Sequence, residues 1–239
     1  MKKITTATLL VLLMVGLLFL GSGEWDMQES IRTAAEGKRN MGESLVDEVT
    51  DTEKEIRKIA LTFDDGPHPS YTEALLDGLK ERGVVATFFV TGEHATLHPD
   101  IIKRMHEEGH LIGNHTYSHI QLQSNNRGEF KEELIATSEV IEEIIQEEVV
   151  YVRPPYGTWD KSFEKELNMI PVLWNVDPLD WCSSDVTDIV NKIVKDVEEN
   201  DIILMHDYYE TSVEAALMAV DILLEKGYTF VTVEEILFD

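Results

Sequence analysis

Residues 60–67 read ALTFDDGP, a short apolar run that ends in two adjacent aspartates, Asp64 and Asp65, and then in a Gly-Pro pair. Neighbouring carboxylates repel each other, and neither Asp nor Gly nor Pro favours a strand. Asp-Gly-Pro is also a common turn composition, so these eight residues alone fit a solvated turn as well as a functional site. The surrounding sequence has to decide between these two interpretations.

Strands and helices are predicted to alternate outward from this stretch. Short apolar segments rich in β-branched and aromatic residues predict strands at 57–63, 84–90, 110–113, 149–152, 171–176, 201–205 and 228–233. Amphipathic segments between them predict helices, the first of which begins with Ser70 and Glu73 at the spacing of a capping box. The pattern predicts an α/β fold with a parallel sheet covered by helices. It leaves open an irregular barrel related to the (β/α)8 type and a doubly wound sheet.

The N-terminal residues have the features of an export signal. Lys2 and Lys3 precede the apolar run Leu9–Leu20, and small residues follow at 21–23. We expect residues 1–23 to be a cleaved signal peptide, with a retained membrane anchor as the alternative. Residues 24–56 are predicted to be a polar linker and residues 57–239 the folded domain. The protein is therefore expected to be exported, either secreted or held at the cell envelope.

The charge balance limits the partners of the protein. Forty-six acidic residues against 20 basic ones give a formal net charge of −26. Such a surface repels nucleic acid and anionic membranes, so neither is expected as a partner, and membrane contact is expected only through the N-terminal segment. Cys182 is the only cysteine, which excludes an internal disulfide. We expect a monomer.

Polar residues follow most of the predicted strands. In either architecture the active site lies beyond the carboxyl ends of the strands. The segments after strands one, three, four, five and six are DDGP, NHTYSH, RPPYG, DPLDW and HD. This clustering favours a functional site over a simple turn. The histidines in predicted loops and helices are expected to be solvated or to cap helices: His68, His94, His98, His106 and His110.

The residues at this edge of the sheet indicate metal chemistry. His115 and His119 are four residues apart, so on a helical turn they would point the same way and share one ion. Two imidazoles and one carboxylate form a three-ligand site with open positions. Because Asp64 and Asp65 are adjacent at a strand end, they point in different directions, so one can bind the metal while the other acts as a base. Metal-bound water is a nucleophile near neutral pH, and His206 is the remaining candidate for the acid.

Five motifs in one order carry a family resemblance. TFDDGP, HTYSH, RPPYG, DPLDW and LMH resemble the motifs of the polysaccharide deacetylase family, the carbohydrate esterases with a NodB homology domain. The resemblance covers residues 57–239 and implies a distorted (β/α)7 barrel, with parallel strands and helices outside. It implies that Asp64 is the general base and His206 the general acid. It also implies that a divalent ion, usually zinc with cobalt or another ion as alternatives, is held by Asp65, His115 and His119.

The same resemblance assigns supporting roles. Arg153 would steady the catalytic base, and Asp180 would pair with His206 and tune it. The backbone N–H of Tyr156 would help to hold the oxyanion. Trp181 and Leu204 would line the pocket for the acetyl methyl group and the sugar face, and ordinary core packing is the alternative for both.

The resemblance implies a metal-dependent hydrolase that removes N-acetyl groups from N-acetylglucosamine residues of a cell-wall or chitin-type polysaccharide and releases acetate. An O-acetyl esterase acting on xylan would use the same residues. A glycan-binding module without turnover would be expected to lack the base or the acid, but Asp64 and His206 are both present. A non-haem iron oxygenase also uses two histidines and a carboxylate, yet it requires neither a second adjacent Asp nor a separate His acid.

Overall fold

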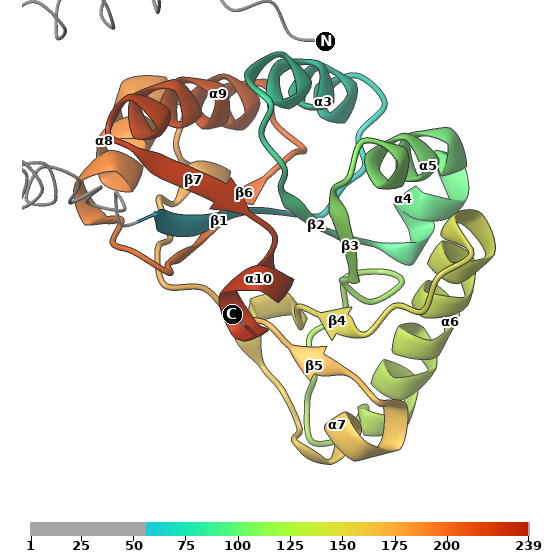
Figure 1. The fold of residues 1–239 in the computed structure, drawn as a ribbon. Helices are drawn as coiled ribbons and strands as arrows, with labels where there is room; N and C mark the ends of the chain where they lie inside the picture. Colours follow the sequence, from blue (N-terminus) through green and yellow to red (C-terminus); the bar gives the residue numbers. More distant parts are fainter. Residues whose placement is uncertain (1–55, 239) are drawn as a thin grey trace, which may run out of the picture. The chain divides into compact units, whose positions relative to one another are not determined.

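The computed structural model of the protein describes residues 56–238 (Figure 1). The predictions for residues 1–23 and, apart from Ile56, for the linker 24–56 lie outside the described residues. Within the described part, no helix combines the length and the apolar character that crossing a membrane requires.

Seven strands alternate with helices along the described chain. The strands are β1 (Arg57–Asp64), β2 (Thr87–Val90), β3 (Leu111–Asn114), β4 (Tyr151–Val152), β5 (Ile170–Pro171), β6 (Ile202–His206) and β7 (Tyr228–Val231). The helices are α3 (Tyr71–Arg82), α4 (Gly92–Leu97), α5 (Pro99–Glu107), α6 (Arg127–Ile145), α7 (Ser162–Leu167), α8 (Val186–Asp196), α9 (Glu210–Glu225) and α10 (Val233–Phe238). Two 3-10 turns, Pro155–Gly157 and Asp180–Cys182, follow β4 and β5.

The strands form one parallel sheet that curls towards closure. Its order is β5-β4-β3-β2-β1-β6, and β7 pairs with Arg57–Ala60 of β1. The chain after β5 reaches the far edge of the sheet through a single bridge between Val176 and Ile203. The predicted distorted (β/α)7 barrel is confirmed. The predicted strand 171–176 is regular only at its beginning, and Pro171 has no N–H with which to continue a ladder.

Successive side chains of β1 point to opposite faces of the sheet and enter different clusters. Ile59, Leu61 and Phe63 belong to the large apolar cluster that also contains residues of the surrounding helices. Ala60 belongs to a second cluster with Phe89 of β2. Because both faces of β1 are buried, the strand is a nearly continuous apolar run rather than an alternating one. Asp64, two positions after Thr62 on the same face, lies at its carboxyl end.

Two local predictions are wrong. Ser70 precedes α3, but its side chain accepts no helix N–H. Instead, His68 Nδ1 accepts the N–H groups of Ser70 and Tyr71 at 3.2 Å, so an imidazole replaces the expected capping hydroxyl. His110 was expected to be solvated or capping, yet it is buried and its Nδ1 accepts the N–H of Ala86 at 3.0 Å. Burial lowers the pKa of His110 to about 4, which keeps it neutral as an acceptor.

Gly113 of β3 tests how tightly the sheet is packed. A Cβ at this position would lie 2.5 Å from Cδ1 of the buried Phe89, whereas one at Gly128 of α6 would meet nothing within 4 Å. Gly113→Ala should lower the free energy of unfolding by about 1–3 kcal/mol through overpacking. The matched Gly128→Ala should raise it by up to about 1 kcal/mol, because alanine favours a helix. Chemical denaturation compares the two, and an undiminished stability of Gly113→Ala would contradict this packing.

Candidate active site

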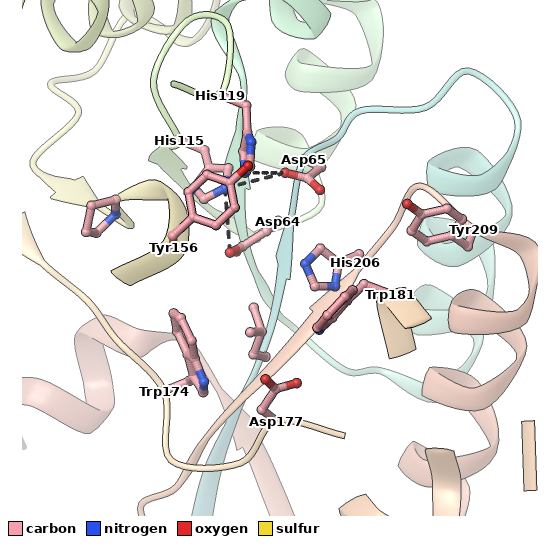
Figure 2. Close-up of a pocket in the computed structure, with 12 residues that line it drawn as sticks. Asp64, Asp65, His115, His119, Tyr156, Trp174, Asp177, Trp181, His206 and Tyr209 are labelled. Carbon is pink, nitrogen blue, oxygen red and sulfur yellow. Dashed lines mark ion pairs between the residues drawn. The ribbon is translucent and has the colours of Figure 1, made fainter. Parts of the chain in front are cut away.

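A pocket of about 530 Å³ lies at the carboxyl ends of the strands (Figure 2). Its lining comprises Asp64, Asp65, His115, His119, Pro154, Tyr156, Trp174, Asp177, Trp181, Leu204, His206 and Tyr209. All the site residues predicted from the sequence are in this set except Arg153 and Asp180. Both are hydrogen-bonded to residues of the lining: Arg153 donates to Asp64, and Asp180 accepts from His206.

Asp65, His115 and His119 offer ligand atoms within 4.8 Å of one another. Nε2 of each histidine lies 3.4 Å from Asp65 Oδ1, which is too long for an ordinary hydrogen bond (Figure 2). Two ligand atoms that each lie about 2.0–2.1 Å from a tetrahedral zinc ion are roughly 3.3 Å apart. Asp65 Oδ1 is buried and has no hydrogen-bond partner among the described residues. The three side chains therefore fit a divalent ion in both chemistry and spacing.

The charge state of Asp65 suits a metal ligand. Burial opposes its ionisation, but the facing ring of His115 and the charges of His115, His119 and His206 outweigh this and lower its pKa to about 2. Nδ1 of His115 donates to the carbonyl of Arg153 at 2.6 Å. This bond fixes the tautomer of His115 and leaves the lone pair of Nε2 directed at Asp65. The cluster thus presents the carboxylate of Asp65 to Nε2 of both histidines.

The two histidines converge without a helix, so the predicted helical turn is wrong. Thr116 and His119 have φ angles of 61° and 60°, and the loop between them is irregular. Glu133 of α6 accepts two backbone N–H groups of this loop at 3.0 and 2.7 Å. Asn114 accepts the N–H of Thr116 at 2.8 Å. These carboxylate and amide contacts, rather than helical periodicity, bring the two rings together.

Asp64 lies in a different environment from its neighbour. Its Oδ1 accepts a hydrogen bond from Arg153 Nη1 at 2.8 Å, and its Oδ2 faces His115 Nε2 at 3.8 Å. Arg153 is fully buried and also donates to Thr62 Oγ1 at 2.7 Å. Burial lowers the pKa of Arg153 while Asp64 opposes this, and an arginine remains charged because its pKa begins so high. The adjacent aspartates are therefore tolerated because one faces a guanidinium and the other faces two imidazoles.

His206 and Asp180 form a coupled pair beside these residues. His206 Nδ1 donates to Asp180 Oδ1 at 2.9 Å, and the backbone N–H of His206 donates to Asp180 Oδ2 at 2.9 Å. Burial opposes protonation of His206, but the bond to Asp180 and the charges of Asp180, Asp64 and Asp65 raise its pKa to about 9. Asp64 and His206 are in-register partners on β1 and β6. The pocket therefore holds a carboxylate and an imidazolium on neighbouring strands.

Aromatic residues form much of the remaining wall. Tyr156 and Trp181 are 66% and 52% exposed, so core packing is wrong as an account of Trp181. Leu204 is buried but also lines the pocket. Trp174, Asp177 and Tyr209 were not predicted. Tyr209 follows the sixth strand by three residues, so the rule that residues after strand ends form the site could have included it.

His94 was expected to be solvated or capping, but the structure places it beside Asp65. Its Nδ1 donates to the carbonyl oxygen of Asp65 at 2.7 Å, and its ring stacks on Tyr208 at 5.2 Å between centroids. Asp65 has a φ of 75°, a conformation that a non-glycine residue rarely adopts. The bond from His94 helps to hold that conformation. No local sequence pattern connects residues that are 29 positions apart.

Comparisons with known proteins identify a family. Residues 51–172 match the family model described as polysaccharide deacetylase. The peptidoglycan-N-acetylmuramic acid deacetylase PdaC of Bacillus subtilis is 38% identical over 178 residues, which are 74% of this chain and 38% of PdaC. A peptidoglycan-N-acetylglucosamine deacetylase of Bacillus cereus is 38% identical over 182 residues, 73% of this chain and 66% of that protein.

Solved structures give the same result. The structure of PdaC superposes with a TM-score of 0.74 at 37% identity, covering 76% of this chain and 90% of the PdaC chain. The CE4 domain of a multidomain xylanase from the hindgut metagenome of Trinervitermes trinervoides has a TM-score of 0.69 at 31% identity and covers 76% and 89%. The fold is that of the CE4 family. The chain belongs to the polysaccharide deacetylase family, and it spans well under half the length of curated PdaC.

The pairing of His206 with Asp180 predicts a measurable titration. In the metal-free protein, NMR titration of the His206 ring should give a pKa of about 9, above the ordinary value of 6.5, and Asp180→Asn should bring it down. Because the folded-state pKa is raised, the stability that this pair contributes is complete below pH 6.5 and is lost as the pH rises through about 9. A wild-type His206 that titrates near its ordinary value would contradict the geometry.

Proposed function

We propose that the protein is a metal-dependent hydrolase that removes N-acetyl groups from N-acetylglucosamine residues of a cell-wall or chitin-type polysaccharide and releases acetate. The observation that carries this proposal is the division of the adjacent aspartates. Asp64 is bonded to Arg153, whereas Asp65 faces His115 and His119. The name of the Bacillus cereus relative supports the same reaction, and the N-acetylmuramic acid deacetylase PdaC supports deacetylation of a cell-wall glycan more generally.

The metal would be held by Asp65, His115 and His119, with zinc as the first choice and cobalt or another divalent ion as alternatives. When bound, such an ion supplies Lewis acidity and lowers the pKa of a bound water. The protein contributes the proton-transfer groups. Asp64 accepts the proton of the attacking water, and Arg153 holds one carboxylate oxygen so that the other faces the pocket.

The remaining residues act on the substrate. The backbone N–H of Tyr156 donates to the carbonyl oxygen as negative charge develops there. His206 gives a proton from Nε2 to the departing amine, and Asp180, bonded to Nδ1, stabilises the protonated ring until that transfer. Trp181 and Leu204 receive the acetyl methyl group and the sugar face. The products are acetate and a free amine on the glycan.

We also propose that residues 1–23 direct export, that residues 24–56 are a linker, and that the protein acts outside the cell as a monomer. The basis for export is the sequence alone: two lysines, an apolar run and small residues.

Acetate release tests the reaction and the substrate together. The purified protein is stripped with a chelator and assayed on N-acetylglucosamine oligomers and on acetylated xylan, before and after zinc is returned. We expect zinc-restored release from the oligomers. Release from xylan alone would make the protein an O-acetyl esterase, and the similarity to the xylanase CE4 domain makes that comparison necessary. Absence of release from both with metal bound would mean either that the substrate is a different polymer or that the groove binds glycan without turnover.

Replacing Asp64 and replacing Asp65 should have different effects on zinc content. Asp65→Ala should lose both zinc and activity, because it removes a ligand from the cluster. Asp64→Asn should keep zinc near wild-type stoichiometry while kcat falls by about 10²–10⁴-fold, the usual contribution of a general base. Elemental analysis and kcat of the two variants provide the comparison. Normal turnover by Asp64→Asn would exclude Asp64 as the base.

His206 should behave as an acid and not as a ligand. His206→Ala should retain zinc but lower kcat by about 10²–10⁴-fold, since protonation of the leaving amine is lost. His106→Ala is a matched control, because His106 lies on α5 and is not part of the pocket lining. If His206→Ala loses zinc and His106→Ala does not, His206 is a ligand and the assignment fails.

A further inference from the structure

Aromatic rings continue from the pocket onto the neighbouring surface. We call this set the aromatic band, and it consists of Tyr209, Tyr208, His94, His68 and Tyr71. Tyr209 lines the pocket, and its ring centroid lies 6.1 Å from that of Tyr208. His94 stacks on Tyr208, His68 meets Tyr208 edge-on at 5.1 Å, and His68 stacks on Tyr71 at 4.3 Å. The segments after β1, β2 and β6 thus supply one connected group of rings.

The outer part of the band is surface, while Tyr71 at its far end also packs against the core. Tyr208 and Tyr209 are 37% and 43% exposed, and His94, His68 and Tyr71 are half-buried. Single exposed aromatic residues are common and need no explanation. Here, however, the exposed rings are contiguous and begin at the pocket. The half-buried histidines hold Tyr208 from two directions, one ring stacked at 24° and the other edge-on at 86°.

The pocket has room for only part of a polymer. Its volume of about 530 Å³ is typical of a small-molecule site, whereas a polysaccharide continues beyond the reacting unit. Aromatic residues also lie at the opposite side of the site. Figure 2 shows Tyr156 and Trp174 on one side of Asp64 and Tyr209 on the other, with His206 between. Aromatic rings therefore lie on both sides of the pocket, where the units next to the reacting sugar would lie.

The chemistry of the band suits an uncharged sugar. Tyrosine combines a large apolar face with a polar tip, which matches the apolar face and hydroxyl rim of a pyranose ring. No lysine or arginine is among the residues that line the pocket, and its lining includes the carboxylates of Asp64, Asp65 and Asp177. A unit that carries a carboxylate therefore finds no cationic partner in the lining apart from His206, which is already paired with Asp180. The band fits an N-acetylhexosamine or hexosamine unit without an acidic substituent.

We propose that the aromatic band is a subsite for the neutral pyranose unit next to the one that is deacetylated, and that the glycan strand runs from Trp174 across the pocket to Tyr208. The direction of the strand rests on the proposed function. The binding of sugar by Tyr208 can be measured without turnover.

The test is calorimetric binding of penta-N-acetylchitopentaose to the full protein and its variants. Tyr208→Ala should raise the Kd about 2–10-fold, the usual contribution of one aromatic contact, whereas Tyr208→Phe, which keeps the flat ring and loses only the hydroxyl, should raise it less. Tyr208→Leu keeps apolar bulk against His94 but lacks the flat ring, so it should behave like Tyr208→Ala. Met218→Ala on α9 removes an exposed apolar side chain outside the band and should have no effect.

Two further readouts separate the possible causes. Thermal unfolding without sugar should be the same for Tyr208→Leu and Tyr208→Phe, which excludes a general loss of structure. Mass spectrometry of partly deacetylated pentamer should show that Tyr208→Leu spreads the reaction over more positions than the wild type does. An unchanged Kd in both Tyr208→Leu and Tyr208→Ala would overturn the subsite. Weakened binding without any acetate release would keep the subsite and reject the proposed function.

Discussion

The site depends on one buried cation. The guanidinium of Arg153 donates to Asp64 on β1 and to the carbonyl of Val172 after β5, and it lies 4.2 Å from the ring centroid of Phe89. The backbone carbonyl of the same residue orients His115. Loss of one partner of a buried ion pair typically costs about 3–5 kcal/mol, since the other charge is left uncompensated. Arg153 therefore fixes the orientation of Asp64 and the tautomer of His115. It also connects β1 to the segment after β5 that closes the barrel.

The division between Asp64 and Asp65 follows from this constraint and from the backbone after β1. Asp64 still belongs to the strand and points with its in-register partner His206. Asp65 leaves the strand with a φ of 75° and so reaches the histidines. The turn that follows Asp65 is closely packed, because a Cβ on Gly66 would lie 2.2 Å from the carboxylate of Asp207. Asp207 is fully buried, and burial raises its pKa to about 7.

Much of this organisation could be predicted from the sequence, because parallel strands bring their carboxyl ends to one edge. That rule, applied to five strand ends, selected the residues that surround the pocket. It could not predict how the 115–119 loop turns, since Glu133 of α6 holds it from a distant position. It also missed His94 and Trp174, whose positions depend on packing between elements. The strand count was predictable from apolar periodicity, whereas closure through a single bridge at Val176 was not.

In the proposed mechanism Asp65 holds the ion while Asp64 stays outside the coordination sphere. Anomalous diffraction at the zinc edge, from crystals of the zinc-loaded protein, tests this most directly. We expect one anomalous peak bonded to Asp65 Oδ1 and to Nε2 of His115 and His119, with Asp64 still bonded to Arg153. A peak that is coordinated by Asp64, or that lies away from this cluster, would contradict it.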